Sequence, residues 1–532
     1  MLKWMRSGSP WIWLTAGTVS LSLLAVLGLL LMIGWKGLSY FWPAQVYRFD
    51  VSLADHQQVI VGEIYETRQV PRQQLLEAGY ELAGNENPTI ARYLIKTGNR
   101  ELADLDFVTL LDTQIRSKEV AHGVAVIDRL RNGKFYGYPQ AVMVNGSSHS
   151  AALLADWLSQ AEAAKEAILE LQQTQYIPLN RQLASLAASS DETSESRRGE
   201  LLARLREVEH ELGQIRQVLD GQSLLMKDAE GREVQIPLAD ILDVWYPNDM
   251  SFSEKVAHWG RQVGHFVTDA PREANTEGGV FPAIFGTVLM VLLMSVIVTP
   301  LGVLAAIYLH EYAKQNRFTR LIRVAVINLA GVPSIVYGVF GLGFFVYMVG
   351  GTIDELFFSD QLPAPTFGTP GILWSALTLA ILTLPVVIVS TEEGLARIPP
   401  SIRHGSLALG ATQAETLWRI VIPMASPAIM TGLILAVARA AGEVAPLMLV
   451  GVVKMAPSLP IDAQFPYLHL DRKFMHLGYH IYDVGFQSPN VEAARPLVYA
   501  TSLLLVTVII GLNLTAIGIR NHLREKFRDL EQ

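Results

Sequence analysis

The sequence predicts an all-α polytopic membrane protein that carries an inserted α+β domain. Half of its 532 residues are hydrophobic and only 17% are charged, which lies outside the composition of ordinary soluble proteins. Six apolar runs are long enough to cross a hydrocarbon core of about 30 Å, which takes about 20 helical residues. A long polar stretch, Lys36–Gly279, separates the first run from the other five.

The first apolar run, Trp11–Trp35, has two interpretations, a signal peptide and an uncleaved anchor. The run is long for a signal peptide, and an aromatic belt, Trp35–Trp42, follows in place of a small-residue cleavage site. We therefore expect residues 1–35 to be a cytoplasmic tail and the first transmembrane helix. The other helices are expected at Phe281–Leu309, Leu321–Val349, Ile372–Ser390, Ala425–Val453 and Leu497–Ile519.

Basic residues near the apolar runs define the expected topology, because cytoplasmic loops are rich in Lys and Arg. All of the basic clusters fall on one side of a six-helix arrangement. We therefore expect both termini in the cytoplasm, with a short tail at 521–532, and residues 36–279 on the opposite face, which is periplasmic in a Gram-negative cell. The basic residues are Lys3, Arg6, Lys314, Arg317, Arg320, Arg323, Arg397, Arg403, Arg419, Arg520, Arg524, Lys526 and Arg528.

The inserted domain shows both strand and helix patterns. Loose alternation predicts strands within Asp50–Tyr65 and Gly123–Val144, and Ser223–Pro237 has the pattern of a β-hairpin. Apolar residues recur at three-four spacing along Leu154–Leu171 and Leu201–Leu219, which predicts an antiparallel coiled-coil hairpin. The apolar stripe has two interpretations, a hairpin packed on itself and a docking arm for a partner.

Four of the apolar runs contain a proline, namely Pro300, Pro333, Pro385 and Pro446. Each proline removes one backbone hydrogen bond, which a bilayer tolerates only where neighbours or a cavity satisfy the freed carbonyl. Pro446 frees the carbonyl of Gly442, so we expect a helix kink there. Together, the prolines favour a bundle that changes conformation.

Arg439 and Glu443 lie within the fifth apolar run. Counting about 1.5 Å per residue from Pro427 places Arg439 about 18 Å into the helix. Charges at this depth cost roughly 2.5–3.5 kcal/mol each when unpaired. Their i and i+4 spacing allows them to pair with each other. Two roles are therefore open: an ion pair that fixes helix packing, and an arginine that meets an oxyanion in a substrate pathway.

Several kinds of site have little support in the sequence. His476 and His480 have the i and i+4 spacing of metal ligands, with Asp483 nearby, but Gly478 interrupts the pattern; we expect a polar lid or docking surface there and no metal. The chain has no cysteine and no GxxxxGK[ST] run, so it lacks thiolate ligands and a phosphate-cradling loop of its own. The net charge of −8 does not suggest nucleic acid.

A family resemblance is carried by the polar segment before the fifth run. Gly410 is followed after nine residues by Ile420-Val421-Ile422-Pro423, which is similar to the Gly-x9-Ile-x-Leu-Pro signature of ABC importer permeases. With this signature, Phe281–Arg520 resembles the PstA-type membrane subunit of phosphate ABC importers. The other segments that carry the resemblance are IYLHEYA, NLAGVPSIVYGVFGLGFF, LPVVIVSTEEGLARIPPSIRHGSLALGAT and ARAAGEVAPL. The chain departs from that family at His404-Gly405-Ser406, where Glu-Ala-Ala is usual, and at Val444, where Thr is common.

The resemblance implies a type I ABC importer permease fold over residues 280–520, in the inner membrane of a bacterium. It implies three kinds of partner besides the lipid bilayer: a second phosphate permease subunit in a heterodimer, two copies of an ATP-binding subunit, and a periplasmic phosphate-binding protein. ATP and Mg would bind the ATPase, so the chain needs no cofactor and is not expected to be an enzyme.

The resemblance also implies that residues 391–423 form a coupling loop. We expect Ile402–Trp418 to be one amphipathic coupling helix that docks in a cleft of the ATPase. The loop residues singled out are Arg403, His404, Gly405, Ser406, Gly410, Ile420 and Pro423.

Other functions remain open at this point. Related oxyanion permeases also place Arg and Gly-Glu in this helix, so sulfate or molybdate are alternative substrates. A membrane sensor would have the same anchor and outer domain, but the cytoplasmic segments here are short. An ion-coupled secondary transporter would be expected to show internal repeats and discontinuous half-helices.

Overall fold

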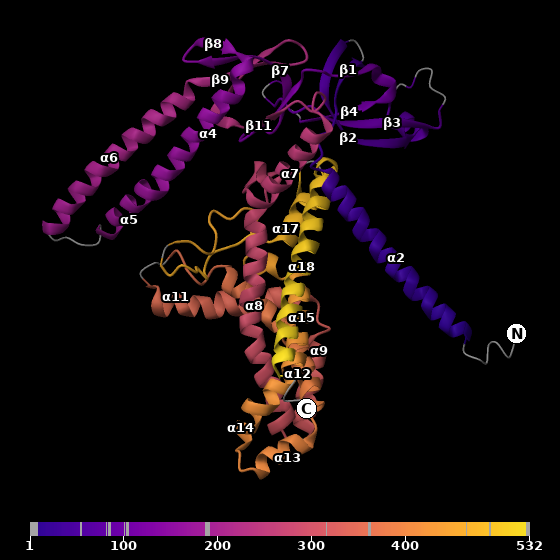
Figure 1. Cartoon of the computed structure of the whole chain (residues 1–532), viewed down its shortest axis with the longest axis vertical. Helices are drawn as coiled ribbons and strands as arrows, with labels where there is room; N and C mark the ends of the chain where they lie inside the picture. The colour runs from indigo at the N-terminus through magenta and orange to yellow at the C-terminus, as the bar shows by residue number, and fades with distance from the viewer. Residues whose placement is uncertain are drawn as a thin grey trace. The chain divides into compact units, whose positions relative to one another are not determined.

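The computed structural model describes residues 9–53, 56–80, 82, 87–100, 102, 106–186, 192–314, 316–359, 363–463, 465–488 and 491–527. The chain divides into two compact units, one formed by Trp42–Gly260 and the other by Met1–Phe41 with Arg261–Gln532. The first unit holds the two larger sheets and two helical arms, and the second holds the long apolar helices and the short pair β12 (Pro271–Arg272) and β13 (Glu277–Gly278) (Figure 1).

A five-stranded antiparallel sheet begins the Trp42–Gly260 unit, in the order β4-β3-β2-β1-β5. Its buried face includes Phe49, Ile95 and Leu110. The predicted strand zone, Asp50–Tyr65, overlaps only β1 and β2. Edge strand β5 was not predicted, because its exposed charges obscure the alternation of apolar and polar residues. The strands are β1 (Val46–Leu53), β2 (His56–Pro71), β3 (Thr89–Lys96), β4 (Phe107–Leu111) and β5 (Ile115–Val120).

A second, six-stranded sheet follows the order β10-β9-β7-β6-β11, and β8 pairs with β7. The predicted hairpin in Ser223–Pro237 is confirmed as β9 and β10, whose turn is fixed by backbone N–H groups of Glu230 and Arg232 that donate to Asp228 at 2.9 and 2.8 Å. The strands are β6 (Ala125–Arg129), β7 (Phe135–Val144), β8 (Ser147–Ser150), β9 (Gln222–Lys227), β10 (Glu233–Pro237) and β11 (Ile241–Trp245).

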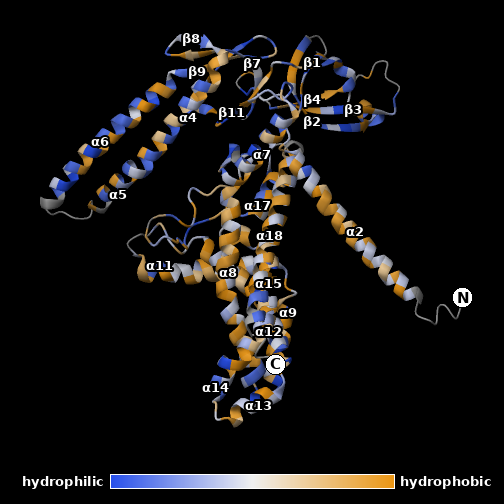
Figure 2. Cartoon of the chain, viewed as in Figure 1, coloured by the Kyte–Doolittle hydropathy of each residue, from blue (hydrophilic) through white to orange (hydrophobic). Residues whose placement is uncertain are grey.

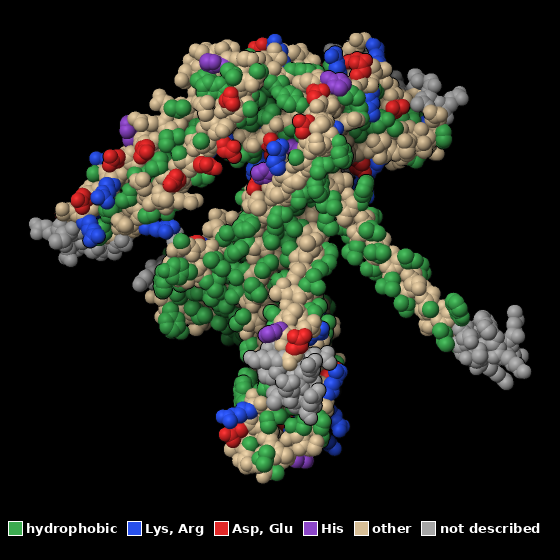
Figure 3. All heavy atoms as spheres, viewed as in Figure 1, with side chains coloured by type: hydrophobic (Ala, Val, Ile, Leu, Met, Phe, Trp, Pro, Cys, Tyr) green, Lys and Arg blue, Asp and Glu red, His purple; other side chains and the backbone are tan. Residues whose placement is uncertain are grey.

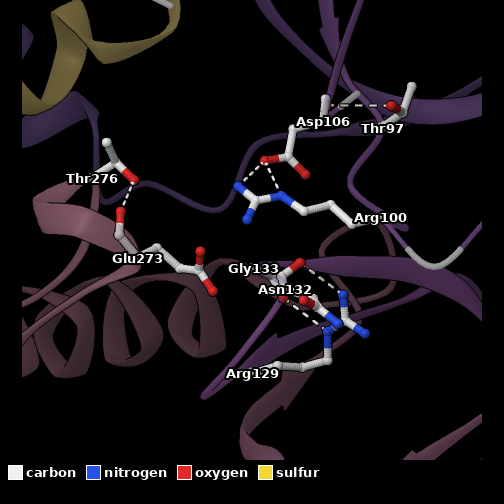
Figure 4. Close-up of polar contacts among 8 residues, drawn as sticks. All are labelled: Thr97, Arg100, Asp106, Arg129, Asn132, Gly133, Glu273 and Thr276. Atoms are coloured by element: carbon white, nitrogen blue, oxygen red, sulfur yellow. Dashed lines mark hydrogen bonds and ion pairs between the residues drawn. The ribbon is translucent and has the colours of Figure 1, made fainter. Parts of the chain in front are cut away.

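The turn between β6 and β7 is held by a buried arginine (Figure 4). Arg129 donates from Nε to the Gly133 carbonyl at 2.8 Å and from Nη2 to the Asn132 carbonyl at 2.9 Å. Asn132 and Gly133 both have positive φ, as residues of such turns commonly do. Elsewhere in this unit, Arg100 pairs with Asp106, its Nε donating at 2.7 Å.

Two helical arms extend the sheet unit. The first arm comprises α4 (Leu154–Leu171), the π-helical η3 (Gln172–Tyr176) and α5 (Ile177–Leu186), and the second is α6 (Glu192–Asp220). The arms contact each other, and α4 also packs on the second sheet. The predicted helices are therefore present, while the heptad packing of a coiled coil stays a prediction.

Six helices among the described residues are long and apolar enough to cross a membrane, judged by length and composition. Figure 2 shows the hydrophobic colouring that runs along them. The first, α2 (Ser9–Ser39), contacts the others through its C-terminal end, where Lys36 lies over the ring of Tyr499. The spans are Trp11–Ser39, Phe281–Tyr312, Ser334–Phe357, Ile372–Ala396, Gln413–Gly442 and Ala494–His522.

Helix α12 lies at the centre of the helical bundle. It packs against α8 and α15, and 67% of its most apolar window is buried, against 33% or less for the other spans. Hydrophobic side chains cover the visible face of this bundle, and charged side chains gather at the end that holds α13 and α14 (Figure 3). The main helices are α8 (Phe281–Ile307), α12 (Ile372–Ala396), α15 (Ile422–Gly442) and α18 (Val491–Phe527).

The expected third span, Leu321–Val349, is wrong. Helix α9 (Arg317–Leu329) ends before Pro333, which starts α10 (Ser334–Phe340). Proline disfavours helical backbone in the residue before it, so the apolar run is divided there. The chain continues through the π-helical η7 (Gly341–Gly350) into α11 (Gly351–Phe357). Of the four prolines expected inside spans, Pro300 and Pro385 do lie within helices.

Candidate functional site: a charged helix end and a coupling segment

Arg439 and Glu443 form the ion pair that their spacing predicts. Arg439 lies in the last turn of α15 and Glu443 directly follows the helix. Arg439 Nε is 3.6 Å from Glu443 Oε1, with side chains 30% and 23% exposed. A charge-assisted hydrogen bond is shorter, about 2.7–2.9 Å. Within the described part of the chain Arg439 makes no hydrogen bond, so its guanidinium retains donors for another acceptor.

The expected kink at Gly442 and Pro446 is a complete break. Helix α15 ends at Gly442, and Glu443 is extended, with φ −82° and ψ 129°. Pro446 cannot donate to the Gly442 carbonyl and instead starts α16 (Leu447–Val450). The predicted span Ala425–Val453 is therefore displaced, because the observed span, Gln413–Gly442, begins and ends earlier. Irregular backbone in a membrane span occurs where it is buried in protein or lines a cavity.

The break packs against α10 at a small residue, Gly338. A Cβ atom at Gly338 would lie 2.7 Å from Pro446 Cα, so only glycine allows this approach. On the adjacent side of α15, Ala436 and Ala440 are fully buried in the main hydrophobic cluster.

The segment between α12 and α15 folds into two short helices, which corrects the expected single helix over Ile402–Trp418. Helix α13 (Pro400–Ala408) ends at Gly410, whose φ of +92° is rarely adopted by residues with a side chain. Thr412 and Glu415 then form a capping box that starts α14 (Gln413–Thr416). We call residues 400–421 the coupling segment.

Two of the predicted coupling residues face inward. Ser406 is buried and its hydroxyl lies 2.8 Å from that of Thr416, which joins α13 to α14. Arg403 donates to the carbonyls of Leu395 and Ile398 at 2.8 and 3.0 Å. These groups therefore hold the segment in shape.

The other predicted residues lie outside or at the junction with α15. His404, Gly405 and Gly410 are exposed. Ile420 is half-buried in the π-helical η9 (Leu417–Val421), which runs directly into α15, and Pro423 lies in the first turn of that helix. A displacement of the coupling segment is therefore transmitted covalently to the helix that carries Arg439.

Two further features of this region were not predicted from the sequence. The large apolar side chains of Leu409 and Trp418 are 90% and 67% exposed, within the polar coupling segment. Arg403 also lies 2.9 Å from Glu311, which follows α8 in the π-helical η6 (Tyr308–Tyr312). The IYLHEYA motif contains Glu311, but nothing in its local pattern indicates the partner.

The histidine cluster is buried, so the expected polar lid or docking surface is wrong. His476 and His480 are nearly inaccessible, and Asp483 lies 3.1 Å from Lys454. His476 caps α17 (Leu477–Tyr482), because its Nδ1 accepts from the Gly478 N–H at 3.1 Å. Burial lowers the pKa of both histidines to about 4. Among the described residues no group of three or more His, Cys, Asp or Glu side chains is arranged to hold a metal ion.

Comparison with known proteins identifies the family. Residues 298–529 match the family model described as binding-protein-dependent transport system inner membrane component. The probable ABC transporter permease protein YqgI of Bacillus subtilis (strain 168) is 31% identical over 258 residues, covering 47% of this chain and 81% of YqgI. The phosphate transport system permease protein PstA 1 of Mycobacterium tuberculosis (strain CDC 1551 / Oshkosh) is 34% identical over 244 residues, covering 46% and 71%.

The solved structures show a more distant likeness. The MetNI methionine ABC transporter, in an inward-facing conformation, is 18% identical with a TM-score of 0.33, covering 46% of this chain and 94% of that chain. The chain belongs to the family of binding-protein-dependent transport system inner membrane components, the permease components of ABC transporters, and is not itself an ATPase.

Proposed function

We propose that the chain is the permease subunit of an ATP-driven importer of inorganic phosphate in the bacterial inner membrane. It would form half of the translocation pathway, the other half coming from a second phosphate permease subunit. Two ATP-binding subunits would drive it from the cytoplasm, where both termini would lie, and a periplasmic phosphate-binding protein would deliver the substrate. Relatives named as phosphate transport permeases support this substrate.

A stripe along α15 carries the proposal. Leu435, Arg439 and Gly442 follow one another at i, i+4 and i+7, so they lie on one side of the helix. All three stay exposed or half-exposed in the isolated chain, whereas the alanines on the adjacent side are fully buried. This side is therefore available to line a pathway with the second permease subunit.

The chemistry of the ion pair suits an oxyanion. The planar fork of Arg439 matches two oxygens of a tetrahedral anion, and the C-terminal end of α15 favours a cation. Glu443 balances the charge when the pathway is empty. It also limits the affinity for the anion, which lets the anion leave.

Glu443 favours phosphate over other oxyanions. Hydrogen phosphate keeps a proton at neutral pH and can donate it in a hydrogen bond to the carboxylate. Sulfate and molybdate carry no proton at that pH, so a nearby carboxylate repels them. Protein sites can discriminate between ligands in this way, through an acceptor that only one ligand satisfies and that repels the others.

The coupling segment provides the surface for the ATPase. Leu409 and Trp418 are among the large apolar side chains that this segment exposes, and tryptophan is enriched among the residues that dominate protein interfaces. ATP and Mg would bind the partner ATPase. Closure of the two ATP-binding subunits would then move the coupling segment and shift the helices between inward-open and outward-open states. The Trp42–Gly260 unit would dock or orient the binding protein outside the cytoplasm.

Uptake of radiolabelled phosphate in a strain that lacks its own phosphate importer tests the proposal. Cells that express this chain with its partner subunits should accumulate phosphate, and excess sulfate or molybdate should not compete. No uptake of phosphate, together with uptake of labelled sulfate or molybdate, would assign the pathway to another oxyanion.

A further inference from the structure

We propose that Arg403 is the positioning residue through which the coupling segment moves two transmembrane helices, α8 and α12. This inference rests on the proposed docking of that segment on an ATPase. It assigns Arg403 an internal role, in place of the contact with the ATPase that its position in the family motif suggests.

Arg403 binds groups from two other elements at once. Its Nη1 donates to the Ile398 carbonyl at 3.0 Å and its Nη2 to the Leu395 carbonyl at 2.8 Å. Nη2 also lies 2.9 Å from Glu311 Oε1. Leu395 belongs to the last turn of α12, and Glu311 lies in η6, which continues α8.

Each of these contacts resists separation. Carbonyls at a helix end are not fully satisfied within the helix, and the guanidinium gives the Leu395 carbonyl a donor in addition to the Ile398 backbone N–H. The Arg403 and Glu311 side chains are only 18% and 12% exposed, which weakens solvent screening of their attraction. A planar fork of donors also fixes direction, which a lysine ammonium does not.

For α8, the covalent chain leaves this role to a side chain. The coupling segment runs through η9 into α15, and only residues 397–399 separate it from α12, so the backbone itself links both helices to the segment. Helix α8 reaches α13 only through the intervening elements α9 to α12, and for α12 the Arg403 contacts add to the short backbone link. Because α8, α12 and α15 share one hydrophobic cluster, motion of α15 alone would disrupt their packing, and Arg403 allows all three to move together.

The chain offers a matched control nearby. Arg323 on α9 lies 3.1 Å from Glu392 on α12, and its Nη2 donates to the Leu309 carbonyl at 3.3 Å. This second arginine therefore binds the same two helical ends, with side chains 33% and 15% exposed. Among the residues that the structure describes, it makes no ion pair or hydrogen bond with the coupling segment.

The test measures phosphate transported per ATP hydrolysed by the complete complex in proteoliposomes, supplied with its binding protein. Arg403→Gln should lower this ratio roughly tenfold, about what the loss of one hydrogen bond to a charged group costs. Glu311→Gln should lower it in the same direction, and Arg403→Lys should be intermediate. ATP hydrolysis should persist in all three, and Arg323→Gln should leave the ratio unchanged.

Two results would overturn the inference. One is an unchanged ratio of phosphate transported to ATP hydrolysed in the Arg403 and Glu311 variants. If the Arg403→Gln complex does not assemble, the Arg403→Lys and Glu311→Gln complexes decide the question. The other is an equal fall in Arg323→Gln, which would show a general loss of helix packing. A wild-type complex that transports sulfate in place of phosphate contradicts the proposed substrate only, and the same ratio measured with sulfate then tests Arg403.

Discussion

Replacing Glu443 with glutamine should tighten anion binding and slow its release. Arg439 and Glu443 are 3.6 Å apart and partly exposed. At this distance an effective dielectric constant of about 20 gives a Coulomb attraction of roughly 4–5 kcal/mol before solvent screening. Exposed pairs retain only about 0.2–1 kcal/mol, and breaking buried pairs costs about 3–5 kcal/mol. For this partly exposed pair we take an intermediate interaction free energy of about 1–2 kcal/mol. Its loss corresponds to roughly 5–30-fold tighter apparent binding of the anion.

The reason is that Glu443→Gln keeps the shape of the side chain and removes the charge that competes with the anion for Arg439. Turnover should fall because release becomes slower, and sulfate should compete better because the repelling carboxylate is gone. Arg439→Lys should fail nearly as badly as Arg439→Ala, since a point charge does not reproduce the bidentate fork. The assay is uptake as a function of substrate concentration, normalised to the amount of assembled complex.

A charge exchange provides the refutation. Arg439→Glu combined with Glu443→Arg keeps an ion pair but moves the guanidinium by four residues, about 6 Å along a helix. Uptake should remain low in this double variant although the complex assembles. Restored uptake would mean that the pair only holds helices together, and the anion contact would have to be abandoned.

Three other predictions concern different parts of the chain. Gly410→Asp should leave the protein in the membrane but abolish ATP-driven uptake, while Gly410→Asn, which tolerates positive φ without adding charge, should retain more activity; normal uptake by the Asp variant would exclude this turn from docking. Protease added to intact spheroplasts should cut near Ser189–Ser196, part of which lies outside the described residues, and cleavage only after lysis would place the insert in the cytoplasm. Burial holds the pKa of His476 near 4, below its unfolded value of about 6.5, so the folded state binds fewer protons than the unfolded state. Acidification from pH 6.5 to 5 should therefore lower the free energy of unfolding by about 2 kcal/mol through this group. Melting temperatures in detergent should fall less steeply over that range for His476→Asn, which keeps a capping acceptor for Gly478; an unaltered slope would exclude His476 as the cause.

The long helices could be predicted from the sequence because a bilayer demands apolar length, and all six runs gave a candidate span. Their breaks were predicted only in part: the apolar run continues across Pro333, where no break was expected, and at Gly442 and Pro446 a kink was expected in place of a helix end. Each proline ends one helix and starts the next. A run of apolar residues therefore predicts that the membrane is crossed, and the backbone chemistry decides where the helix stops.

The site was only partly predictable for a related reason. The pairing of Arg439 with Glu443 is local, so its spacing is sufficient to predict it. The contacts of Arg403 depend on Glu311, which is distant in the sequence and comes close only when α8 packs against α12. His476 and His480 lie in a connecting segment, where polar residues are usually exposed, and only tertiary packing buries them.

Phosphate accumulation by the reconstituted complex tests the central claim most directly. Proteoliposomes would contain this chain, its permease partner and the ATP-binding subunits, with the binding protein and labelled phosphate on the side opposite ATP. The account predicts accumulation that requires ATP and is lost in Arg439→Ala at an unchanged content of assembled complex. Accumulation without ATP, or full accumulation by Arg439→Ala, would contradict it.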